Sequence, residues 1–167
     1  MLRLFVLATA IGFVLAGPLQ AGIQVRFIEG APKDQFVFKN LGSCDLEASI
    51  LSLDLAGSSG RLIFDVSDTG AGVEVFQPFE LIDGADSLRE LPSVVDGQTS
   101  VELQIVSLKV GDSIAFTIDV DDTIGQREIT VSGTEIVGAQ VFYEKDGQSS
   151  TAVFSSEAQT MVTIPDC

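Results

Sequence analysis

Apolar and polar residues alternate along much of the chain in short runs, and this pattern predicts β-strands. The clearest run spans residues 113–120, where every second side chain is apolar, as in a strand with one buried face. Similar runs predict strands over residues 23–28, 35–39, 48–55, 61–67, 101–106, 127–132, 139–143, 153–154 and 161–164. Pro78 interrupts another apolar run, over residues 73–81, and indicates a strand at a sheet edge or a bulge.

Turn residues separate the predicted strands and suggest how they connect. The G-S-S-G turn at residues 57–60 predicts a hairpin between the strands before and after it. Residues 82–97 are polar and irregular, so we expect a loop there, with one helical turn around residues 87–91. Many short strands at regular spacing predict an all-β fold, an antiparallel two-sheet β-sandwich of Ig-like or jelly-roll type.

The first 21 residues have the features of a secretory signal peptide. One positive charge at Arg3 precedes an apolar run over residues 4–16, a Gly17-Pro18 break and the small residue Ala21. The apolar run is shorter than the roughly 20 residues that span a bilayer, so we expect no membrane span. Cleavage after Ala21 leaves 146 of the 167 residues, a single domain over residues 22–167. We therefore expect a protein that is secreted, periplasmic or held at the cell surface.

Composition excludes several classes of function. The chain has 9 basic and 24 acidic residues, and losing Arg3 with the leader changes the net charge from −15 to −16. Such a surface repels nucleic acid, so a cation or a basic extracellular macromolecule is the expected partner. The chain has no His, which removes His-dependent catalysis and His-ligated zinc. With no Trp and one Tyr, an aromatic platform for sugars is disfavoured, and we expect no enzyme activity.

The densest group of acids lies where the clearest strand ends. Asp119, Asp121 and Asp122 have no Lys or Arg closer in sequence than Lys109 and Arg127. Calcium takes six to eight oxygen ligands from carboxylates, carbonyls and water, so these three aspartates are the predicted calcium ligands. The alternative is a hydrated turn whose carboxylates accept hydrogen bonds from nearby backbone amides.

A second acidic group flanks the D-T-G-A-G turn at residues 68–72. Asp65, Asp68 and Glu74 meet the first group only if the two loops lie at the same end of the sandwich, and otherwise they face solvent. A pair such as Asp119 and Glu74 would suit a carboxylate-based polysaccharide hydrolase, which needs two acids at a set separation. A third reading is a periplasmic chaperone or inhibitor that uses an exposed sheet edge near Pro78.

The chain has two cysteines, Cys44 and Cys167, and an exported protein is in a compartment that permits disulfides. The expected outcome is one Cys44–Cys167 bridge. By the loop-entropy model such a long closed loop stabilises a protein by roughly 4–5 kcal/mol. A redox or metal-binding pair is disfavoured because the spacing is not C-x-x-C and no His is available.

Four segments resemble a known family. They are R-L-I-F-D-V at residues 61–66, G-A-G-V-E-V-F-Q-P-F-E-L at 70–81, F-T-I-D-V-D-D-T at 116–123 and I-T-V-S-G-T-E-I-V-G-A at 129–139. With A-P-K-D at residues 31–34 and both cysteines, the chain is similar to small exported proteins of marine alphaproteobacteria called "aggregation factor core". The resemblance implies calcium and cell-surface association. The sequence as a whole therefore predicts a non-catalytic secreted β-sandwich, a structural or adhesive module stabilised by calcium.

Overall fold

The structure, a computed structural model, describes residues 22–68, 70, 72, 76–124 and 130–165. The predicted signal peptide, residues 1–21, lies outside the described residues, and β1 begins at Gly22. Within the described ranges, no helix has the length and apolar character needed to cross a membrane.

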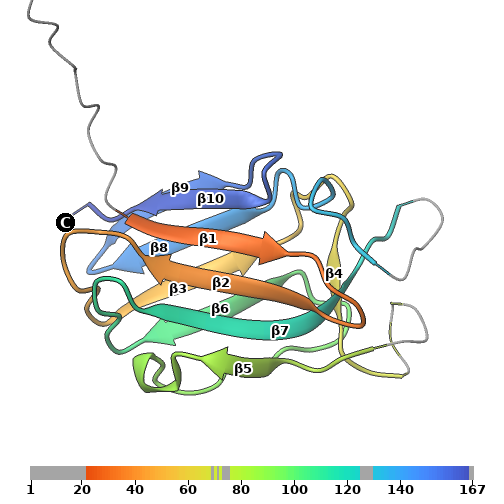
Figure 1. Ribbon diagram of the computed structural model, residues 1–167, viewed down its shortest axis with the longest axis horizontal. Coiled ribbons are helices and arrows are strands. Elements are labelled where there is room, and N and C mark those ends of the chain that lie inside the picture. Colours follow the sequence, from red (N-terminus) through yellow and green to blue (C-terminus); the bar gives the residue numbers. More distant parts are fainter. Residues whose placement is uncertain (1–21, 69, 71, 73–75, 125–129, 166–167) are drawn as a thin grey trace, which may run out of the picture.

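Two antiparallel sheets pack face to face, so the predicted two-sheet β-sandwich is confirmed (Figure 1). The first sheet has the order β10-β1-β2-β7-β4, and β5 also pairs with β7. Its strands are β10 (Gln159–Thr163), β1 (Gly22–Ile28), β2 (Asp34–Asn40), β7 (Ser113–Asp121), β4 (Ile63–Asp65) and β5 (Glu80–Asp83). The second sheet has the order β6-β3-β8-β9, with β6 (Ser100–Ile105), β3 (Ser49–Asp54), β8 (Gln140–Lys145) and β9 (Gln148–Val153).

Phenylalanines fill the centre of the core between the sheets. Phe36 of β2 pairs directly with Phe116 of β7, and their ring centroids lie 5.4 Å apart. Phe27 and Phe79 extend this group, with centroids 5.2 Å from Phe36 and 4.8 Å from Phe116 respectively. The apolar residues that alternate along residues 113–120 therefore face the core, as their period of two predicts.

The predicted hairpin across residues 57–60 is wrong. β3 pairs with β6 and β8 of the second sheet, whereas β4 pairs with β7 of the first. The connection crosses from one sheet to the other, and it passes so close to residue 138 that a Cβ added at Gly57 would lie 2.7 Å from the Gly138 carbonyl oxygen. Alternation shows which residues form a strand, but it does not show which sheet the strand joins.

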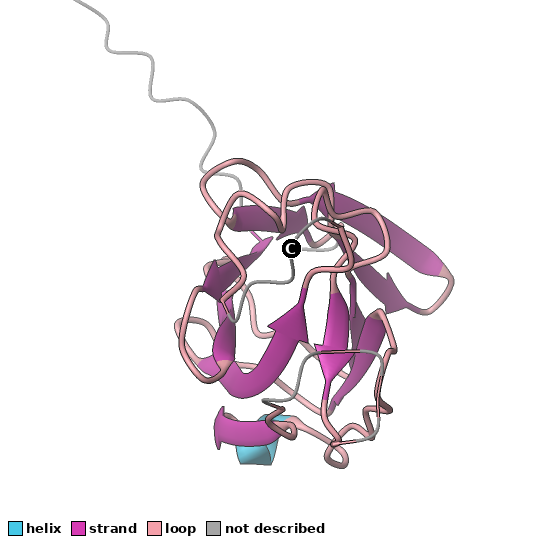
Figure 2. Ribbon diagram, turned by 90° about the vertical axis from the view of Figure 1, so that its right-hand side faces the viewer, coloured by secondary structure: helices cyan, strands magenta, loops and turns pink. Residues whose placement is uncertain are grey.

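The other differences between the predicted and the observed elements are local. The predicted loop over residues 82–97 contains one 3-10 turn, η1 (Ala85–Ser87), slightly earlier than expected and beside β5 (Figure 2). β5 is a short edge strand after Pro78, and its register with β7 shifts between Leu81 and Asp83. The strand expected over residues 127–132 lies partly outside the described residues, and residues 130–132 are not in a strand.

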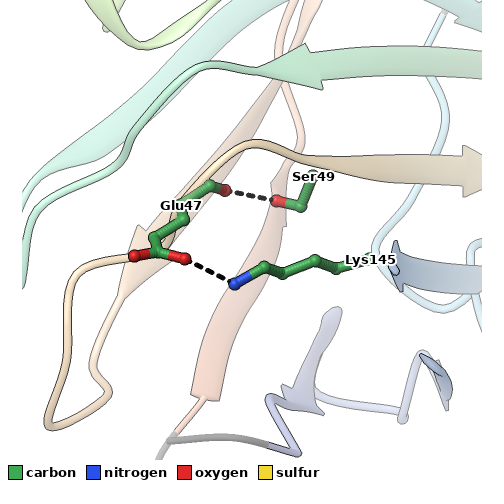
Figure 3. Close-up of polar contacts among 3 residues, drawn as sticks. All are labelled: Glu47, Ser49 and Lys145. Carbon is green, nitrogen blue, oxygen red and sulfur yellow. Dashed lines mark hydrogen bonds and ion pairs between the residues drawn. The ribbon is translucent and has the colours of Figure 1, made fainter. Parts of the chain in front are cut away.

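Asn40 fixes the loop that carries Cys44. This buried side chain donates hydrogen bonds to the carbonyl oxygens of Cys44 (3.0 Å) and Leu108 (2.9 Å), and accepts one from the amide of Gly42 (2.9 Å). After this loop, Lys145 at the end of β8 binds the Glu47 carboxylate at 2.6 Å, and Ser49 donates to the Glu47 carbonyl (Figure 3).

Cys167 lies outside the described residues, so the Cys44–Cys167 bridge stays a prediction. Cys44 and Ile164, three residues before Cys167 in the sequence, line the same surface hollow.

Candidate functional site

The candidate site lies at the end of β7, where β4 runs beside it at the side of the molecule opposite the C-terminus (Figure 1). Asp65 of β4 is directly opposite Asp119 of β7 in this antiparallel pair. Directly opposed residues point to the same face, and so do residues two apart along a strand, which adds Asp121 to the group. The pairing therefore brings together three aspartates from segments more than fifty residues apart in the sequence.

These aspartates point away from the phenylalanine core, yet they are buried. Asp65 is 0% exposed, Asp119 4% and Asp121 2%. Gly72 lies against two of them, because a Cβ added there would lie 2.1 Å from Asp65 Oδ2 and 2.4 Å from Asp121 Oδ2. Only a residue without a side chain fits there. Figure 2 looks onto this end of the molecule, where loops surround the strand ends.

Asp65 is unusual because neither of its carboxylate oxygens accepts a hydrogen bond from an N–H or O–H donor of the described residues. Carboxyl groups of Asp96 and Asp121 lie beside it, but a contact between two carboxyls is a hydrogen bond only when one carries a proton. A fully buried carboxylate without a donor is costly in free energy. The site therefore needs a positive charge, a proton or both.

The pKa values of these aspartates reflect the same crowding of like charges. Burial, with Asp96 and Asp121 beside it, raises the pKa of Asp65 to about 7. Burial, together with Asp121 and Asp65, raises the pKa of Asp119 to about 7. In the described part of the chain every buried charged residue is an aspartate, and the ion pairs Lys33–Glu80 and Lys145–Glu47 lie elsewhere.

Asp96 holds the loop that follows β4. Its Oδ1 accepts hydrogen bonds from the amides of Val66 (2.9 Å) and Ser67 (3.1 Å). A Cβ added at Gly70 would lie 1.6 Å from Asp96 Oδ2, so the Asp96 carboxylate leaves room only for glycine at residue 70. The two glycines of the D-T-G-A-G turn thus each lie against a different part of the acidic cluster.

The structure brings some of the predicted site residues together and places others elsewhere. Asp122, 8% exposed, follows the last residue of β7, and the alternation along the strand directs it away from the face that carries Asp119 and Asp121. In the second acidic group, Asp65 meets Asp119 and Asp121, Asp68 is exposed, and Glu74 lies outside the described residues. Asp96 was missed because it lies in an irregular polar loop, where an acid is the expected solvent-facing residue.

As placed, no group of three or more Asp, Glu or Cys side chains among the described residues has the arrangement of a complete metal site. Asp65 Oδ2 and Asp121 Oδ2 lie no more than 4.5 Å apart, since they lie 2.1 and 2.4 Å from a Cβ added at Gly72. Calcium readily takes its remaining ligands from backbone carbonyls and water, so two converging carboxylates can form one part of its shell.

Comparisons with known proteins identify no family. No family model matches the chain, and no curated protein matches it. Among solved structures, the chain is similar to the carbohydrate-binding module CBM3b from the cellulosomal cellobiohydrolase 9A of Clostridium thermocellum, at 15% identity and a TM-score of 0.34. The match covers 77% of this chain and 94% of that chain. At this level of similarity it transfers no ligand and no residue role.

Proposed function

We propose that the protein is an exported, non-catalytic β-sandwich that acts as a structural or adhesive module and is stabilised by calcium at the acidic end of β7. The observation that supports this most directly is the burial of Asp119 and Asp121 beside a third aspartate, with no basic side chain buried among the described residues. Like charges so close and so poorly hydrated repel strongly, and a divalent cation removes that repulsion.

Burial also argues against the hydrolase alternative. A polysaccharide hydrolase must present its two acids to a sugar ring in an open cleft. Asp119, Asp121 and Asp122 are instead nearly inaccessible to solvent. A buried carboxylate that cannot touch substrate suits a bound ion better than an acid or a nucleophile.

The alternative of a periplasmic chaperone or inhibitor that binds through a sheet edge finds little support in β5, the edge strand near Pro78. β5 has four residues with an acid at each end, and Lys33 forms an ion pair with Glu80 on it. Short, charged edge strands are typical of edges that are protected against pairing. A chaperone that adds a client strand would need a longer and more neutral edge at this place.

Calcium dependence is tested by melting the purified protein in calcium and in chelator. At about a hundred times its Kd, a ligand stabilises the folded state by about 2.7 kcal/mol. For a domain of this size we expect Tm to rise by about 5–10 °C. Sodium chloride at matched ionic strength is the control, because it screens charges without occupying a site. A Tm unmoved by both calcium and chelator would contradict the proposal.

A further inference from the structure

The acids at the end of β7 are not equivalent, and Asp65 differs from the rest. It belongs to β4, it is fully buried, and its two oxygens lack donors from the described residues. An outward-facing residue of a sheet normally obtains its hydrogen bonds from water. Since Asp65 is fully buried, something other than bulk solvent must complete its surroundings.

The position of Gly72 shows how close the two carboxylates lie to each other. A Cβ added at Gly72 would lie 2.1 Å from Asp65 Oδ2 and 2.4 Å from Asp121 Oδ2, so these two oxygens are no more than 4.5 Å apart. Calcium binds carboxylate oxygens at about 2.3–2.6 Å. Two oxygens no more than 4.5 Å apart can therefore bind one calcium ion between them.

The two carboxylates come from different strands, which limits how they can adjust. The β4–β7 pairing matches Ile63 with Asp121 and Asp65 with Asp119, so Asp65 and Asp121 are diagonal neighbours on one face. β4 is also fixed on its other side, where Phe64 exchanges hydrogen bonds of 2.9 Å with the backbone of Gly97 and Gln98. The strand therefore cannot move away to relieve the repulsion without breaking both pairings.

We propose that a calcium ion binds between the carboxylates of Asp65 and Asp121, on the face of the β4–β7 pair that carries both side chains. Asp119, on the same face and opposite Asp65, adds negative charge, and water and backbone carbonyls complete the shell. This inference rests on the proposed calcium dependence, but it moves the centre of the site from residues 119–122 to the junction of β4 with β7. Asp122 is then dispensable for binding.

Calcium fits this place better than magnesium. Magnesium demands short bonds of 2.0–2.1 Å in a regular octahedron and keeps several waters. Two carboxylates fixed on a rigid strand pair do not offer that regular geometry. Calcium accepts irregular shells, so the measured response should be much weaker with magnesium.

The test compares the full exported chain with two variants that change the site in different ways. Gly72→Ala leaves every charge in place, but its methyl group would clash with both carboxylates and push them out of the position in which they share an ion. Asp65→Asn keeps the shape of the side chain and removes one ligand charge. Gly133→Ala is the matched control, because a Cβ there would lie 3.2 Å from the Ala158 methyl, with no carboxylate among its nearest neighbours. The readouts are calorimetric calcium affinity and the calcium-induced shift in Tm.

We expect Gly72→Ala and Asp65→Asn each to weaken calcium binding at least tenfold, and Gly133→Ala to bind as the wild type does. Asp65→Asn should also raise the calcium-free Tm, because it removes a buried charge; a variant that merely misfolds would lower it. Wild-type affinity in both variants would overturn the proposed location while leaving the proposed function intact. A wild-type protein that does not respond to calcium would overturn both.

Discussion

At the scale of single residues, Asp34 shows how burial makes stability depend on pH. It is 2% exposed at the start of β2, and its Oδ1 accepts a hydrogen bond from the Gly30 amide at 3.0 Å. Burial raises its pKa to about 8, and the charges of Asp119 and Glu29, which face it, act in the same direction. The folded protein therefore binds a proton here that the unfolded chain, with an ordinary Asp pKa near 4, has released.

The sign of the effect follows from this proton. Because the folded-state pKa is raised, Asp34 contributes stability that is fully present below about pH 4 and is lost as pH rises to about 8. In chelator, Asp34→Asn should flatten the fall in unfolding free energy between pH 5 and pH 8, as measured by urea denaturation. Asp45→Asn is the control, since the exposed Asp45 also accepts a backbone hydrogen bond, from Val110 at 2.9 Å. An unchanged pH profile in Asp34→Asn would contradict the assignment.

Asn40, the only asparagine in the chain, is a second residue whose role depends on burial. Asn40→Ala removes hydrogen bonds from the Cys44 carbonyl, the Gly42 amide and the Leu108 carbonyl, of which the last still accepts a bond from the Leu46 amide. Each such loss costs about 1–3 kcal/mol when the group is buried, so we expect a total loss of about 2–4 kcal/mol by urea denaturation.

Ser59→Ala is the matched comparison for Asn40→Ala. Ser59 also bonds two backbone carbonyls, those of Thr134 and Glu135, but it does so at the surface. Water replaces those bonds when the hydroxyl is removed, so the loss should stay below about 1 kcal/mol. Equal losses in the two variants would show that burial is not what makes Asn40 important.

At the scale of elements, the strands were predictable and their partners were not. The period of two along residues 113–120 predicts both the strand and its buried face, and the structure has β7 there. Nothing local distinguishes the G-S-S-G connection, which crosses between sheets, from a hairpin turn. β9 begins earlier than predicted because Q-S-S-T-A-V has polar residues on both faces and lacks the alternation that marks a strand.

The candidate site could likewise be predicted only where it depends on neighbouring residues, and not where it depends on strand pairing. Three neighbouring aspartates are visible in the sequence, so Asp119 and Asp121 could be predicted as a pair. The pairing of Asp65 with Asp119 depends on the β4–β7 register, a contact between distant segments. The need for glycine at residue 72 depends on that contact in turn, so it could not be predicted before the strands were placed.

The arrangement of β4 leads to a prediction about local stability. If calcium joins β4 to β7, it should slow hydrogen exchange in peptides covering residues 62–66 and 118–122, because opening this pair would require release of the ion. The β8–β9 pair, in the other sheet, serves as the internal control. Uniform slowing across both sheets would instead indicate a global effect of calcium, and no change at β4 would contradict the site.

At the scale of the whole molecule, the first and last strands of the fold are neighbours. β1 pairs with β10 from Gly22 opposite Thr163 to Arg26 opposite Gln159. Ser150 of β9 donates a hydrogen bond to the Thr163 carbonyl at 2.6 Å, which links the two sheets at the same place. Loss of β10 would therefore expose one edge of β1 and open this side of the sandwich.

The predicted Cys44–Cys167 bridge would hold β10 in place, since it would anchor the chain just beyond that strand to the loop held by Asn40. We expect Cys44→Ser, Cys167→Ser and the double variant to lose the same stability, roughly 4–5 kcal/mol by the loop-entropy model, because each removes the same cross-link. Urea denaturation of monomeric fractions measures the loss, and intact mass with and without reductant shows whether the bridge is present. Losses that add in the double variant would mean that the two thiols act separately and that no bridge joins them.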